Sequence, residues 1–235
     1  MRNRIIPFVL CGISVGLLTG CGSKSGALQP VQTSITRADA GNYSTDARIL
    51  ASRESTDGWI SAAIARQADT DLSRIRALTD VPDDIHARPQ DDPDSVLVDV
   101  APTAPWKSNW VNGQTTSGVD AIDRIGETYR LTGVTHVGAF STADVFKLTF
   151  ADPLATRIVA ERYAAAGNGI TAATGNPLIG DGDNITRQVS GDTRVYVFSR
   201  GWGDCPAGCT RRHFWTVTLT QDGGTRVEES GTPLP

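Results

Sequence analysis

The chain has 235 residues, an acidic formal charge of −4 at pH 7 and only 6% aromatic residues. This length is enough for one ordinary domain or two small ones, and no apolar run after residue 20 is long enough to cross a membrane. An acidic, aromatic-poor chain without a basic patch excludes nucleic acid as an expected partner.

Residues 1–20 are predicted to be a signal peptide, because two arginines precede an apolar run, 5–18, that is too short for a membrane span. The sequence L-T-G-C then ends at Cys21 and resembles the lipobox of bacterial lipoproteins. The resemblance implies that Cys21 carries lipid and anchors the mature chain in the cell envelope. Gly22 implies the outer membrane of a Gram-negative cell. The alternative is an ordinary secretory signal, with Cys21 incidental.

Two polar stretches are predicted to lack regular structure. Residues 21–43 are rich in Ser, Thr, Gly and Gln, which is typical of a flexible tether. Residues 80–94 are rich in proline and aspartate, which predicts an exposed acidic connector.

Between these stretches, residues 44–79 are predicted to be helical, because apolar side chains recur at helical spacing. Gly58 and the Asp and Thr pairs favour several short helices over one long one. The candidate helix N-caps are Ser44 or Thr45, Thr56, and Asp69 or Thr70.

Residues 95–177 alternate between strand and helix patterns. The expected elements are a strand 96–100, a helix with Val119, Ile122, Ile125 and Tyr129 on one face, strands 134–140 and 145–150, a helix from Pro153 to Gly167, and a strand 170–174. This order predicts a ferredoxin-like βαββαβ module, which is an antiparallel four-stranded sheet with two helices on one face. The predicted fold class of the whole chain is α+β.

Within this module, the sequence F-K-L-T-F-A-D-P and the later A-A-A-G-N-G-I-T-A-A-T-G-N-P resemble the second half of subtilisin-type propeptides and related small inhibitors. The resemblance implies protease inhibition as an alternative function. In those families the segment after the last strand enters a protease cleft, whereas here the chain continues into G-D-G-D-N and further strands.

Residues 178–235 are predicted to form an antiparallel hairpin extension, with paired strands 189–199 and 214–219 and a weak last strand 225–229. Before it, Asp181, Asp183 and Asn184 offer oxygen ligands for calcium. Glycine-aspartate turns are also common without metal, so the calcium site is an open alternative.

The loop between the paired strands holds Cys205 and Cys209, the two cysteines that remain after signal removal and lipidation. An oxidising exported compartment favours a disulfide, which stabilises so short a loop by about 2 kcal/mol. In this interpretation Trp202 and Trp215 cover the disulfide and Asp204 caps backbone N–H groups. A zinc site of Cys205, Cys209 and His213, with Asp204 as a possible fourth ligand, and a cycling redox pair are the alternatives.

The sequence G-W-G-D-C-P-A-G-C followed by H-F-W resembles a motif of uncharacterised bacterial exported proteins and lipoproteins, which implies location but no activity. No catalytic motif is present, so we expect a non-enzymatic binding or scaffold protein without a cofactor, whose partner is an envelope protein or a glycan. A metal-dependent or hydrolytic enzyme is the remaining alternative. The candidate contact residues are Trp202, Asp204, Arg211, Arg212, His213 and Trp215.

Overall fold

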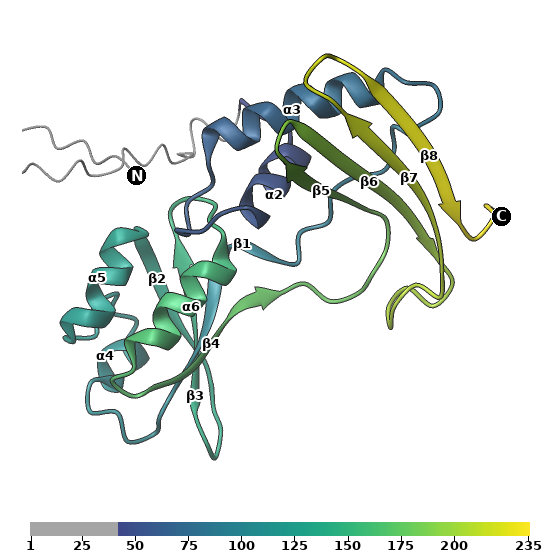
Figure 1. Ribbon diagram of the computed structural model, residues 1–235. Helices are drawn as coiled ribbons and strands as arrows, with labels where there is room; N and C mark the ends of the chain where they lie inside the picture. Colours follow the sequence, from purple (N-terminus) through teal and green to yellow (C-terminus); the bar gives the residue numbers. More distant parts are fainter. Residues whose placement is uncertain (1–41) are drawn as a thin grey trace, which may run out of the picture. The chain divides into compact units, whose positions relative to one another are not determined.

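The computed structural model describes residues 42–235, which combine helices with two antiparallel four-stranded sheets (Figure 1). The predicted signal peptide, nearly all of the predicted tether and Cys21 lie outside the described residues. None of the described helices is long and apolar enough to cross a membrane.

Two helices open the described chain, α2 (Thr45–Arg53) and α3 (Ala62–Arg76). Ser44 caps α2, because its hydroxyl accepts a hydrogen bond from the Ala47 backbone N–H at 3.3 Å. Ser61 caps α3 in the same way, so the predicted cap at Thr56 is wrong. Residues 55–60, between α2 and Ser61, are not helical, and Trp59 forms an isolated β-bridge with Leu154 instead.

The predicted helix break at Asp69 and Thr70 is also wrong, because α3 runs through both residues without interruption. Their side chains have hydrogen-bond partners that leave the helix intact. Asp69 Oδ1 accepts from the Ser44 backbone N–H at 2.9 Å, and the Thr70 hydroxyl donates to the Arg66 carbonyl at 3.0 Å. These contacts outweigh the weak local preference of Asp and Thr for turns.

The predicted connector, 80–94, is less exposed than its composition indicates. Val81, Ile85 and Ala87 are buried in a hydrophobic core. The first strand, β1 (Asp91–Val100), also begins within the connector and before the predicted start at Val96. The prediction of an exposed connector is therefore wrong for these apolar residues.

The first sheet has the strand order β2-β3-β1-β4, with every neighbouring pair antiparallel. Its other strands are β2 (Leu131–Ala139), β3 (Asp144–Phe150) and β4 (Ile170–Pro177). Three helices accompany it, α4 (Lys107–Val111), α5 (Asp120–Thr128) and α6 (Thr156–Ala166). The sequence did not predict α4. The predicted helix start at Pro153 is early, since α6 begins at Thr156.

The core of this part lies between the first sheet and its helices (Figure 1). Trp110 from α4 lies at its centre, with ring centroids 5.5 Å from Phe146 and 6.4 Å from Tyr163. All the buried residues of this core lie in the sequence between Val96 and Ile170. The region between β1 and β4 therefore supplies its own hydrophobic core.

The second sheet has the strand order β5-β6-β7-β8 and is larger than the predicted hairpin. Its strands are β5 (Asn184–Ser190), β6 (Thr193–Trp202), β7 (Arg211–Leu219) and β8 (Thr225–Gly231). The predicted single strand 189–199 is wrong, because the chain turns between β5 and β6. Gly191 occupies this turn with a φ of 55°, which favours glycine.

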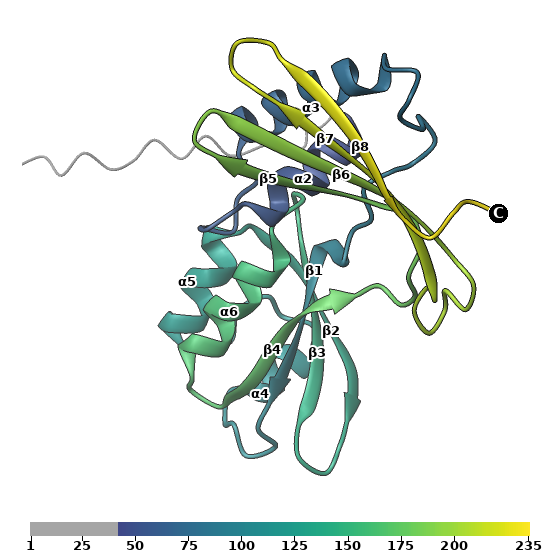
Figure 2. The same cartoon turned by 45° about the vertical axis from the view of Figure 1, so that its right-hand side comes forward.

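Helices α2 and α3 cover one face of the second sheet (Figure 2). Leu50, Leu72 and Ile75 from these helices share a core with Phe198 and Val217 from the sheet. The helices that precede β1 in the sequence therefore complete a core with the strands that follow β4.

A buried polar contact also joins α3 to β6. The Asp71 carboxylate accepts hydrogen bonds from Arg194 Nε at 2.6 Å and from the Tyr196 hydroxyl at 2.9 Å. The hydrogen bonds offset the free-energy cost of burying the charge.

Candidate functional site

The loop between β6 and β7 is closed by a disulfide between Cys205 and Cys209, as the sequence predicted. The two sulfur atoms are bonded to each other, so neither is a thiolate available to zinc. Among residues 42–235, no group of three His, Cys, Asp or Glu side chains is arranged to hold a metal ion.

Asp181 holds this loop from outside. Its backbone N–H donates to the Cys205 carbonyl at 2.9 Å, and its Oδ2 accepts from the Cys209 backbone N–H at 2.9 Å. Its Oδ1 forms an ion pair with Arg212. The predicted capping role of Asp204 is therefore wrong, since Asp181 fills it and Asp204 is exposed.

These contacts also lower the pKa of Asp181. The hydrogen bond from Arg212 has the largest effect, followed by those from the backbone N–H groups of Cys209 and Gly182, and together they hold the pKa of this carboxyl well below its usual range. The Asp181 carboxylate is thus ionised at neutral pH and is bonded both to the loop, at the Cys209 backbone, and to Arg212.

The calcium alternative gains no support from the neighbours of Asp181. Asp183 Oδ1 accepts from the Gly201 backbone N–H at 2.9 Å. Asn184 Oδ1 accepts from Arg53 at 3.0 Å and from the Arg88 backbone N–H at 2.9 Å. The oxygens that were candidates for one cation are instead directed at separate protein donors.

Trp215 does not belong to an exposed contact surface, and this part of the prediction is wrong. Its side chain is only 3% exposed and lies in the core under α2 and α3, opposite Phe198 in the strand register. Trp215 therefore stabilises the second sheet, on the face that the helices cover.

His213 also has structural partners. Its ring lies 4.5 Å from that of Trp215, and its two nitrogens lie 3.0 Å from the Thr232 carbonyl and 3.3 Å from Glu229 Oε2. Arg212 is likewise turned toward Asp181.

Three predicted contact residues remain at the loop. Trp202 is half-buried, and Asp204 and Arg211 are exposed. They lie where β6 ends, within the loop, and where β7 begins.

Two exposed apolar residues near the loop, Leu178 and Ile179, were not among the predicted contact residues, and they are 45% and 93% exposed. They connect the entry to β1 with the loop, because the Leu178 N–H donates to the Gln90 carbonyl, the Ile179 carbonyl accepts from Arg88, and the Asp181 N–H donates to the Cys205 carbonyl. An apolar pair within a glycine- and aspartate-rich turn was the signal available in the sequence. We define the tip surface as Leu178, Ile179, Trp202, Asp204 and Arg211.

Comparison with known proteins finds no family model, no curated protein and no solved structure that matches this chain. The function is therefore argued from the geometry.

Proposed function

We propose that this protein is an envelope-anchored bacterial lipoprotein that binds another envelope protein through the tip surface, without catalysing a reaction. The lipid on Cys21 would hold it at the outer membrane. A protein of the envelope is then the partner within reach of the tip surface.

The observation that carries this proposal is the exposure of apolar side chains beside a loop that is held in place. Single exposed apolar residues are ordinary, but here Leu178 and Ile179 are adjacent, exposed and just before Asp181, while the half-buried Trp202 is paired with Arg211 across the base of the loop that Asp181 holds. Tryptophan and arginine are enriched among the residues that contribute most to binding at protein interfaces.

The rigidity of the loop supports the same function. The disulfide and the Asp181 contacts fix its backbone before any partner arrives. A preorganised surface loses less conformational entropy on binding, which raises affinity.

The fold proposed for 95–177 is the ferredoxin-like one. The element order β1, α4–α5, β2, β3, α6, β4 and the strand order β2-β3-β1-β4 support it. The chain after β4 continues through Leu178 into β5 rather than ending as a free segment. No observation therefore favours protease inhibition, and we do not put that function forward.

A crosslinking pull-down from intact cells tests the proposed function. We expect the wild-type protein to capture one defined envelope protein. The variants Ile179→Ser and Trp202→Ala should reduce its recovery about tenfold or more, because they remove the apolar centre of the surface.

The matched control is Val137→Ser, which changes a 57% exposed side chain on β2. This variant should capture the partner as the wild type does. Equal recovery with all the variants, or capture of glycan without any protein, would contradict the proposal.

A further inference from the structure

A cavity of about 170 Å³ lies between α2, the chain that enters β1 and the segment before α6. Its wall is mainly apolar and includes Ile49, Ile60, Pro89 and Leu154. A cavity of roughly 150 Å³ with such a lining accommodates a benzene-sized group. The cavity is thus large enough for an apolar group of about six carbon atoms.

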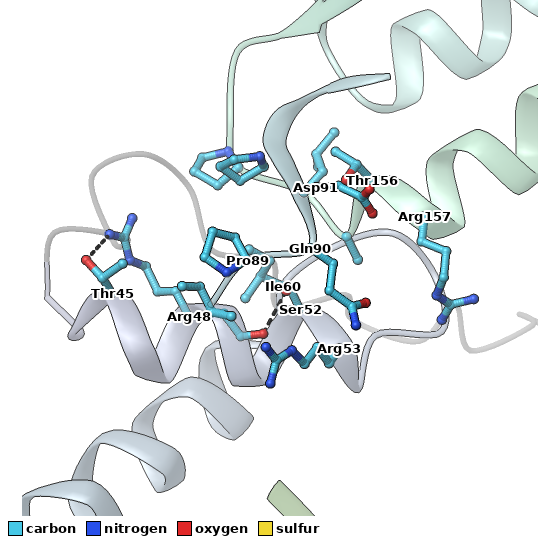
Figure 3. A pocket seen from close by; sticks show the side chains of 15 residues that line it. Thr45, Arg48, Ser52, Arg53, Ile60, Pro89, Gln90, Asp91, Thr156 and Arg157 are labelled. Carbon is cyan, nitrogen blue, oxygen red and sulfur yellow. Dashed lines mark hydrogen bonds between the residues drawn. The ribbon is translucent and has the colours of Figure 1, made fainter. Parts of the chain in front are cut away.

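Three arginines and one carboxylate contribute to the lining, within a chain that is acidic overall (Figure 3). In the view of Figure 3, the Arg48 guanidinium lies at one end, beside Thr45, that of Arg157 lies at the other end, and that of Arg53 lies between them. The carboxylate is Asp91. The cavity therefore carries a local excess of positive charge, which is complementary to an anion.

The partners of these arginines differ. Arg157 forms an ion pair with Glu161 at 2.5 Å. Arg53 donates to the Ile185 and Arg88 carbonyls, both at 2.6 Å, and so has neutral acceptors for its hydrogen bonds.

Arg48 differs from Arg157 in that its hydrogen-bond partner among the described residues is neutral. Its guanidinium donates to the Thr45 hydroxyl at 3.1 Å, while its Nε is buried and has no hydrogen-bond partner. Among the described residues, no carboxylate pairs with Arg48. A guanidinium without a carboxylate partner forms charge-assisted hydrogen bonds with an added anion through its terminal nitrogens.

Asp91 opposes anion binding only at the other end of the cavity. Its charge interacts with that of Arg157, and burial raises the pKa of its carboxyl. An anion beside Arg48 would therefore be separated from the one carboxylate among the lining residues.

We propose that this cavity binds a small carboxylate, with its apolar group against Ile49 and Leu154 and its carboxylate paired with Arg48. A planar carboxylate matches the guanidinium fork of arginine. This chemistry belongs both to small free acids and to the C-terminus of a peptide that ends in an apolar residue. The site does not depend on the proposed function.

Calorimetric titration of the full-length protein tests this site with defined probes. The acidic probes are phenylacetate, 4-methylpentanoate and the N-acetylated dipeptide N-acetyl-Gly-Leu. The neutral probes are phenylacetamide, 4-methylpentan-1-ol and N-acetyl-Gly-Leu amide. We expect at least one acid to bind about tenfold or more tightly than its neutral counterpart, because only the acid pairs with Arg48.

Three variants assign the binding to the cavity. Arg48→Gln should weaken acid binding about tenfold or more, because it removes the charged partner. Ile49→Trp should abolish binding of every probe by filling the cavity. The control Arg124→Gln removes an exposed arginine on α5 and should leave binding unchanged.

Each outcome decides a separate point. Tighter binding of N-acetyl-Gly-Leu than of 4-methylpentanoate identifies a peptide C-terminus as the source, and the reverse identifies a free acid. Equal binding of acids and neutral analogues, or unchanged binding in Arg48→Gln with a wild-type unfolding curve, would overturn the assignment. Absence of binding by every probe would also overturn it, while leaving the tip surface untouched.

Discussion

At the scale of single residues, Asp181 illustrates how a distant side chain organises the disulfide loop. The cysteine pair itself was predictable, because the two residues are close in sequence and export favours oxidation. The carboxylate that holds the loop was not, since Asp181 lies 28 residues before Cys209. The nearer Asp204 was the expected cap, yet it points to solvent.

We predict that Asp181→Asn loosens the loop without breaking the disulfide. The amide side chain loses the ion pair with Arg212, so the variant should be destabilised by about 1 kcal/mol at pH 7, a modest value because Asp181 is partly exposed. Hydrogen exchange at the Cys209 backbone N–H should become faster. Urea unfolding and amide exchange measure the two effects.

The pH dependence of this difference has a definite sign. Because the folded-state pKa of Asp181 is lowered, its contribution to stability is present above the usual carboxyl pKa of about 4 and is lost as the pH falls below it. Wild type and Asp181→Asn should therefore converge in stability at acidic pH. A difference that is constant between neutral and acidic pH would contradict this role. Alkylation before and after reduction checks that the disulfide is intact in both proteins.

At the scale of elements, strand periodicity was visible in the sequence, but the identity of the buried face was not. The alternation in β7 places Trp215 on one face, and only the position of α2 and α3 shows that this face is covered. Contacts with other segments also accompany the continuity of α3. Asp69 is bonded to Ser44, the cap of α2, and Asp71 is bonded to β6, so neither side chain forms a local turn.

We predict losses of stability of very different size for the two tryptophans of this hairpin. Trp215→Ala should reduce the free energy of unfolding by about 3–5 kcal/mol, because it leaves a cavity in the core. Trp202→Ala should reduce it by less than about 1 kcal/mol, because the side chain is half-exposed. Chemical denaturation of both variants measures the difference. Similar losses for the two would contradict the placement of Trp215 in the core and Trp202 at the tip.

At the scale of the whole molecule, the two largest hydrophobic cores of the described chain divide the sequence unevenly. The first core takes its buried members from Val96 to Ile170. The second combines residues from Ala47 to Ala87 with residues from Ile185 to Leu219. The region 91–177 is therefore inserted, in sequence, between the two halves of the second core.

We predict that a fragment 91–178 folds alone, because its core is nearly self-contained. It should unfold cooperatively, with a lower midpoint than the whole chain, since Trp59 no longer packs against this core. The fragment 184–235 should not fold alone, because one face of its sheet would lose α2 and α3. Circular dichroism and urea titration of the two fragments test this difference. A cooperative transition for 184–235 would contradict the dependence of its sheet on the helices.

The sequence alone determined the features that depend on neighbouring residues: the mixed helical and antiparallel strand pattern, the Ser44 cap, the disulfide and the glycine-rich end of α6. Tertiary structure decided that the first helices cover the last strands, that Asp181 rather than Asp204 holds the loop, and that Arg48, Arg53 and Arg157 line one cavity. The physical reason is the distance along the chain over which each kind of interaction acts. Hydrogen-bonding and side-chain preferences act over a few residues, whereas the partner of a buried face or of a charge is set by packing between segments far apart in the chain.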